Sequence, residues 1–203
     1  MGGFSRWVRF YINPKIESST SFEVVCRFHL RGFTLFMSRD RGCNAFSFNR
    51  NMAEYVDGFG DADSDYWLGL NRIKEILDNH SQNRLLVVLI ENQYCENYYD
   101  NFSIASAFDK YALHLGQYES WTAANCGDSF KNSVNIEGSS FSAPGSDQTS
   151  FNCAGTHQGG WWYANTTSCS ECDLTGSRDF MIWPTTLGGA PQRFVGLFIT
   201  KNG

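Results

Sequence analysis

Hydrophobic periodicity runs through the first part of the chain and then fades between residues 120 and 180. That stretch is rich in Gly, Ser, Asn and Asp, and it contains four of the seven cysteines. Segments without periodicity but with turn-forming residues are typical of loops. Strand character returns only at residues 194–199. The sequence therefore predicts a regular part followed by a loop-rich part, which we expect disulfides and aromatic side chains to hold.

The regular part predicts strands and two short helices. Helices are expected at residues 51–57, where Gly58 would end the first, and at 70–77, where Leu and Ile share one face. An Asn13-Pro14 turn is expected between the first two strands. Strands are expected at residues 7–12, 22–26, 33–37, 85–91, 102–104, 111–115 and 194–199.

These elements predict an α+β fold with a central antiparallel sheet and flanking helices. The sheet would lie in residues 20–120 and be closed by the strand at 194–199. We expect one domain over residues 1–203. Its parts would be sheet and helices (1–120), a loop-rich ligand-binding part (121–190) and a returning strand (191–203).

Composition excludes several classes of protein. Hydrophobic residues make up 42% and aromatic residues 16%, which is enough apolar material for a packed core. The net charge of −5 does not fit a nucleic-acid-binding surface. The longest apolar run, residues 85–90, has the length of a strand, so no membrane span is expected.

Cysteines and glycosylation motifs indicate export. Seven cysteines are frequent in secreted chains and unusual in reduced cytosolic ones. Asn79, Asn101 and Asn165 each begin an N-x-Ser/Thr motif, which predicts N-glycosylation in a secreted protein. The odd cysteine count leaves one thiol free or bonded to another chain, and such a bond would link a homo-oligomer.

Catalytic and metal motifs are missing or incomplete. The chain has no G-x-S-x-G, P-loop or H-E-x-x-H pattern, and its four histidines share no metal-binding spacing. Asp61-x-Asp63-x-Asp65 begins like an EF-hand loop but lacks that loop's later Gly and Glu, so it predicts a solvated acidic turn. The spacing of Cys169 and Cys172 is that of a redox motif, but no βαβ context surrounds it. No enzyme is expected.

Several segments together resemble the fibrinogen-like C-terminal domain. This domain is shared by fibrinogen chains, ficolins, tachylectins, tenascins and angiopoietins. The resemblance runs from about residue 11 to residue 199 and implies a non-catalytic extracellular fold. The segments that carry it are 55–60 (YVDGFG), 66–70 (YWLGL), 127–129 (GDS), 152–154 (NCA), 159–163 (GGWWY), 169–176 (CSECDLTG) and 182–183 (IW).

The resemblance implies a disulfide and a ligand site. Cys153 and Cys169 match the family's bridged pair, and such a bridge is worth about 3 kcal/mol in the chain-entropy model. Ligands are expected to meet the loops at 140–180. The implied contact residues are His157, Tyr163, Ser168, Cys169 and Ser170.

The resemblance also implies a calcium ion held by two aspartates, of which this chain keeps one. Gly145 stands at the first position and Asp147 at the second. Because calcium affinity falls as ligand charge is lost, the missing carboxylate argues against the site while leaving calcium as a candidate cofactor.

Two further departures concern the ligand pocket and Cys26. A histidine that often follows the second cysteine is replaced by Ser170, and the stretch from Gly176 to Trp183 is shorter than in the family. Both changes argue against an acetyl-binding pocket of the ficolin type. The usual partner of Cys26 is missing, so Cys26 must pair elsewhere or stay free.

Two functional hypotheses remain. The first is a secreted recognition module that binds a glycan or an extracellular protein through the 140–180 loops, and a lectin-like role in innate immunity is one form of this hypothesis. An acetylated sugar is one candidate glycan. The alternative is a structural, adhesion or receptor-ligand module whose pocket is vestigial.

Overall fold

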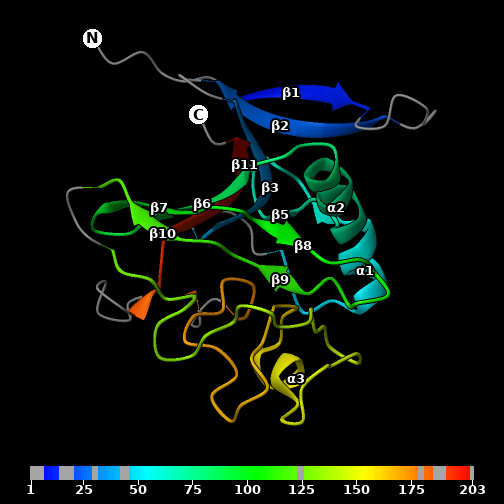
Figure 1. The fold of residues 1–203 in the computed structure, drawn as a ribbon, viewed down its shortest axis with the longest axis vertical. Coiled ribbons are helices and arrows are strands. Elements are labelled where there is room, and N and C mark those ends of the chain that lie inside the picture. The colour runs from blue at the N-terminus through cyan, green and yellow to red at the C-terminus, as the bar shows by residue number, and fades with distance from the viewer. Residues whose placement is uncertain are drawn as a thin grey trace.

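A computed structural model describes residues 7–13, 21–28, 32–41, 46–122, 126–177, 181–184 and 191–201. Its centre is an antiparallel sheet in the order β1-β2-β3-β11-β6-β7-β10 (Figure 1). These strands are β1 (Trp7–Ile12), β2 (Phe22–Phe28), β3 (Gly32–Asp40), β11 (Phe194–Lys201), β6 (Asn83–Ile90), β7 (Tyr94–Tyr99) and β10 (Tyr118–Ser120). The predicted α+β fold with a central antiparallel sheet is confirmed.

The returning strand β11 lies inside the sheet, between β3 and β6. Its pairing with β6 runs from Phe194 opposite Ile90 to Lys201 opposite Asn83. Two short strands, β4 (Phe59–Gly60) and β5 (Tyr66–Trp67), pair beside β3. The last strand of the chain therefore lies in the middle of the sheet and does not close one of its edges.

Alternation along β6 gives the sheet two apolar faces. Leu85, Val87 and Leu89 belong to the main core, whereas Leu86 and Val88 belong to a second cluster on the opposite face. Successive side chains of a strand point to opposite faces, so an unbroken apolar run is the pattern of a strand that is buried on both sides.

Two helices cover the face of the sheet that carries the main core. In α1 (Met52–Asp57), Asn51 and Glu54 form a capping box, and Gly58 follows the helix with φ 95°. In α2 (Leu70–Asp78), the predicted Leu and Ile face is buried against the main core. The two helices lie side by side (Figure 1). No helix in the described ranges has the length and apolarity needed to cross a membrane.

The loop-rich part lies at the end of the molecule opposite β1 and β2 (Figure 1). It is joined to the sheet by the small pair β8 (Ser103–Ile104) and β9 (Leu113–His114), and it contains α3 (Cys153–His157). Trp162 packs edge-on against Phe141 and near Trp67 of the sheet part, with ring centroids 5.1 and 6.2 Å away. Aromatic contacts therefore fill the interior where regular elements are few, as expected.

Some elements differ from the predictions. Strands β4, β5, β7 and β10 and the one-turn helix α3 were not predicted, and the strand expected at 111–115 is reduced to the two residues of β9. The sheet also extends beyond residues 20–120, because β1 pairs with β2 along its whole length. The expected turn at Asn13-Pro14 falls at the edge of residues outside the described ranges.

Candidate functional site

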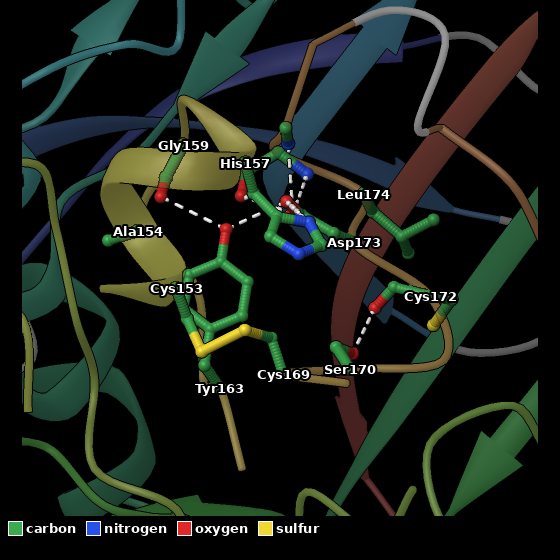
Figure 2. A network of polar contacts seen from close by, with 12 residues as sticks. Cys153, Ala154, His157, Gly159, Tyr163, Cys169, Ser170, Cys172, Asp173 and Leu174 are labelled. Carbon is green, nitrogen blue, oxygen red and sulfur yellow. Dashed lines mark hydrogen bonds and ion pairs between the residues drawn. A yellow bond between two sulfur atoms is a disulfide. The ribbon is translucent and has the colours of Figure 1, made fainter. Parts of the chain in front are cut away.

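A disulfide ties α3 to the loop that follows Tyr163. The sulfur atoms of Cys153 and Cys169, the pair that the resemblance implied, are 2.08 Å apart (Figure 2). Within the loop, the amide of Ala164 donates to the carbonyl of Cys169 at 2.7 Å. The amide of Cys169 donates to the carbonyl of Thr166 at 3.1 Å. The bridge and these bonds fix the loop at both ends.

Tyr163 lies beneath this disulfide and is almost completely buried. Its hydroxyl donates to Asp173 Oδ2 at 2.7 Å and lies 3.1 Å from the carbonyl oxygen of Gly159 (Figure 2). Burial, together with the negative charge of Asp173, raises the pKa of Tyr163 far above its usual range. Tyr163 therefore stays a neutral hydrogen-bond donor at physiological pH.

Asp173 is the centre of the network and is 2% exposed. Its Oδ1 accepts three hydrogen bonds, from Thr175 N and Oγ1 at 3.0 Å each and from Gly176 N at 2.9 Å. The buried guanidinium of Arg39, on β3, donates to the carbonyls of Leu174 and Gly176, the two residues that flank Thr175. A buried carboxylate is tolerated when it is fully hydrogen-bonded, and the sheet thus anchors this loop directly.

His157, the last residue of α3, connects the network to the surface. Its Nδ1 is 3.3 Å from Asp173 Oδ2, and its ring centroid is 5.2 Å from that of Tyr163. Its side chain is 17% exposed, whereas that of Asp173 is 1% exposed. A ligand at the surface can therefore reach the exposed part of an imidazole whose Nδ1 lies next to a buried carboxylate.

Comparison with known proteins identifies the family of this chain. The family described as fibrinogen beta and gamma chains, C-terminal globular domain, matches residues 3–182. The chain belongs to this family. Fibrinogen C-terminal domains are non-catalytic, in agreement with the sequence prediction.

Relatives of this fibrinogen-like domain include larger secreted proteins. Mouse (Mus musculus) angiopoietin-related protein 6 is 30% identical over 185 residues, which cover 84% of this chain and 38% of that protein. Chicken (Gallus gallus) tenascin-R is 30% identical over 147 residues, covering 71% of this chain and 10% of that protein. This chain thus spans well under half the length of these relatives.

Solved structures share the fold over nearly the whole chain. The fibrinogen-like globe domain of human ANGPTL2 is 26% identical, with a TM-score of 0.83 over 99% of this chain and 95% of that chain. Lamprey fibrin D-dimer, solved with the peptide ligand Gly-His-Arg-Pro-amide, is 21% identical, with a TM-score of 0.80 over 98% of this chain and 70% of that chain. That second likeness shows the fold alone.

The fibrinogen-like domain brings the predicted ligand residues into one region but exposes only some of them. Tyr163 and Cys169 are buried, Ser168 is exposed, and His157 is partly exposed. Ser170 is partly buried and its Oγ donates to the carbonyl of Cys172 at 2.5 Å (Figure 2). Peptide bonds in the described ranges are trans, including the one before Cys169. Ligand contact at these positions stays a prediction.

The residues that organise the site were not predicted as functional. Asp173, Thr175 and Arg39 lie outside the expected contact set, although they hold the loop that carries it. The pattern Asp-x-Thr-Gly at 173–176 is one in which an aspartate accepts bonds from the amides that follow it. The Asp-x-Thr-Gly pattern is the sequence signal from which the role of Asp173 and Thr175 could have been predicted.

The calcium position of the family does not fit a metal well in this chain. Asp147 Oδ1 accepts from Thr149 N and Oγ1 at 2.7 Å each, and Oδ2 accepts from Ala154 N at 2.6 Å. Both oxygens are therefore engaged with the protein, and Gly145 offers no side-chain oxygen. Among the described residues, no group of three or more His, Cys, Asp or Glu side chains is placed to hold a metal ion.

The remaining cysteines and the glycosylation motifs are placed as follows. Cys95 and Cys126 form a second disulfide, and Cys26 and Cys172 are buried free thiols. Cys43 lies outside the described residues. The asparagines of the three motifs, Asn79, Asn101 and Asn165, are all exposed, and their glycosylation stays a prediction.

Proposed function

We propose that this fibrinogen-like domain is a secreted recognition module that binds an extracellular protein through the α3 surface. The α3 surface is defined as the exposed part of residues 155–158 and 165–168, with Phe151 beside it. The observation that carries the proposal is the Asp173 network, which holds His157 at the edge of a disulfide-locked loop. Loops presented on a rigid scaffold are the usual location of binding residues.

Rigidity supports this role because a preorganised surface loses little entropy on binding. The loop at 164–169 is fixed by the Cys153–Cys169 bridge, and Asn165 Oδ1 accepts from Ser150 N at 2.8 Å. The latter bond places the start of this loop against the segment that carries Phe151.

Composition of the α3 surface favours a protein over an acetylated sugar. Phe151 is 43% exposed, and exposed aromatic residues are enriched at protein interfaces. Tyr163, the aromatic residue that would form the wall of a sugar pocket, faces Asp173 and is covered by the disulfide loop. The ligand would therefore meet an aromatic anchor surrounded by His157 and hydroxyl groups.

A glycan is the second candidate ligand, because the hydroxyls of Thr166, Thr167 and Ser168 are exposed beside a partly exposed histidine. These groups can donate to and accept from sugar hydroxyls. A glycan attached at Asn165 would occupy the same edge, so glycosylation there would compete with either ligand. The adhesion hypothesis corresponds to the case in which the α3 surface binds neither.

Arrays of purified receptor ectodomains and of glycans, each probed with and without calcium, would test this proposal. The variants His157→Asn and Phe151→Ala should each weaken binding to the protein ligand at least about tenfold, or about 1.4 kcal/mol, since truncating a hot-spot residue costs roughly 2 kcal/mol or more. His80→Asn, at an exposed position two residues after the end of α2, is the matched control and should bind as the wild type does. Equal affinity of all three variants would overturn the proposal.

A further inference from the structure

The face of the sheet opposite α2 carries a pocket that the α3 surface does not include. A second apolar cluster covers this face, built from β2, β3, β6, β7 and β11. Beside it lies a cavity of about 380 Å³, here called the outer-face pocket. Its apolar lining includes Leu35, Val88, Ile90, Phe194 and Phe198. This volume lies within the range of pockets that hold small ligands or side chains.

A glycine allows the apolar lining to form. Gly196 stands opposite Ser38 on β3 and Val88 on β6. A Cβ atom at Gly196 would lie 2.7 Å from Phe198 Cε2 and 3.1 Å from Phe194 Cε1. The two phenyl rings therefore lie over the glycine, where any side chain would push them into the cavity.

One wall of the outer-face pocket is an acidic turn that is fastened to the sheet. Residues 62–64 line the cavity, and Ser38 Oγ donates to the carbonyl of Ser64 at 2.8 Å. Arg9, on β1, pairs with Asp61 at 2.8 Å and with Asp63 at 2.7 Å. The Asp-x-Asp-x-Asp segment that resembled the start of a calcium loop is thus a wall held by a guanidinium.

Carboxylates outnumber cationic groups around the cavity. Asp40 and Asp63 line it together with the guanidinium of Arg193, and Arg9, outside the lining, pairs with Asp61 and Asp63. Glu96 stands opposite Val88 on the same face of the sheet and accepts from the hydroxyl of Tyr98 at 3.3 Å. An apolar cavity with excess negative charge at its rim favours an occupant that is apolar along its length and positively charged at its end.

We propose that the outer-face pocket binds a lysine or arginine side chain, with an adjacent apolar residue, presented by an extended segment of a protein partner. The aliphatic stem would lie against Phe194, Phe198 and Val88. The cationic head would reach the carboxylates at the rim, where Tyr94, which is 42% exposed, donates its hydroxyl to Glu96. The volume leaves room for the apolar neighbour, and the negative rim disfavours anionic lipids and acidic peptides.

The test uses acetylated tetrapeptide amides and amide chemical shifts of the intact domain. Gly-Phe-Arg-Gly should shift the amides of residues 62–64, 88 and 194–198, and its affinity should fall as salt is raised. Gly-Phe-citrulline-Gly, which keeps the shape and removes the charge, and Gly-Phe-Glu-Gly should bind at least about fivefold more weakly. Equal binding of the three peptides, or arginine-dependent shifts confined to other surfaces, would overturn the proposal.

Variants separate this pocket from the α3 surface. Gly196→Ala should lower the affinity for the arginine peptide more than about tenfold, and the rim variants Glu96→Gln and Tyr94→Ala should lower it about threefold. The rim variants keep the test valid if Gly196→Ala does not fold. Glu75→Gln, on α2 at the other face, and His157→Asn should bind the peptide as the wild type does. An effect of His157→Asn equal to that of Glu96→Gln would contradict a separate site.

Discussion

The hydroxyl of Tyr55 accepts a hydrogen bond from the backbone amide of Gly160 at 2.8 Å, across 105 positions of sequence. The same hydroxyl donates to the carbonyl of Phe48 at 2.7 Å. A Cβ atom on Gly160 would lie 2.6 Å from Tyr55 Cε2, so the chain passes over the ring at a distance that only glycine permits. Tyr55 therefore joins helix α1 to the segment that leads into Trp161 and Trp162.

Replacing Tyr55 by phenylalanine should destabilise the domain by about 1–3 kcal/mol. The change removes two hydrogen bonds and leaves the amide of Gly160 and the carbonyl of Phe48 buried without this partner. Urea unfolding at neutral pH measures the effect. Tyr11→Phe, which removes a hydroxyl from a side chain that is 74% exposed, should leave the midpoint unchanged. Equal midpoints for the two variants would contradict the proposed role of Tyr55.

Removing each disulfide should cost stability according to the loop that it closes. The Cys153–Cys169 bridge spans 16 residues and the Cys95–Cys126 bridge spans 31. In the chain-entropy model these loops correspond to about 3 and about 3.7 kcal/mol. Paired Cys→Ser variants compared by urea unfolding should therefore rank in that order. The reverse order would show that contacts made in the folded state, rather than loop length, decide the cost.

The fold was most predictable where a pattern is decided locally. The apolar run of β6 and the Leu and Ile face of α2 are buried as their periodicity indicated. By contrast, β7 is rich in polar residues, and the Oδ1 of its buried Asn97 accepts a hydrogen bond from the hydroxyl of Tyr118 on β10 at 2.8 Å. A strand stabilised by such a cross-strand hydrogen bond has no hydrophobic periodicity in its own sequence from which it could be predicted.

The candidate site was predictable in position but not in exposure. The family motifs located the loops around Cys153 and Cys169, whereas the burial of Tyr163 depends on Asp173, ten positions further along. The position of β11 between β3 and β6 likewise depends on pairing across more than 100 residues. Such long-range pairings are not encoded in any short window of sequence.

Asp147→Ala should destabilise the domain by about 1–2 kcal/mol in the absence of calcium. The carboxylate caps the start of α3 through Ala154 N and closes a turn through Thr149, so its loss is that of a helix cap. Thermal unfolding in a chelator measures this loss. Millimolar calcium should leave the wild-type melting temperature unchanged, because both carboxylate oxygens already accept hydrogen bonds. A calcium-dependent rise that Asp147→Ala abolishes would establish a metal site instead.

Cys172 should resist alkylation in the folded domain. Its side chain is almost completely buried, and its Sγ lies 3.5 Å from the carbonyl of Ser129. Burial, reinforced by the nearby charges of Asp173 and Glu171, raises the pKa of Cys172 well above the ordinary thiol value of 9.0. Since only the thiolate is nucleophilic, native Cys172 should react with iodoacetamide at least about tenfold more slowly than glutathione at pH 8.

The same raised pKa sets the sign of a pH effect on stability. Burial disfavours the thiolate in the folded state, so the Cys172 thiol ionises at a lower pH in the unfolded chain than in the folded one. The contribution of this difference to the free energy of unfolding is fully present below pH 9.0 and is lost as the pH rises further. Cys172→Ala should therefore lose less stability than the wild type between neutral pH and about pH 10.

The reactivity of Cys172 alone is measured by peptide mapping after pulsed alkylation, with concentrated guanidinium chloride as the unfolded reference. Native labelling as fast as that of glutathione would show that this segment opens to solvent, and the buried loop beneath the α3 surface would then be mobile rather than rigid.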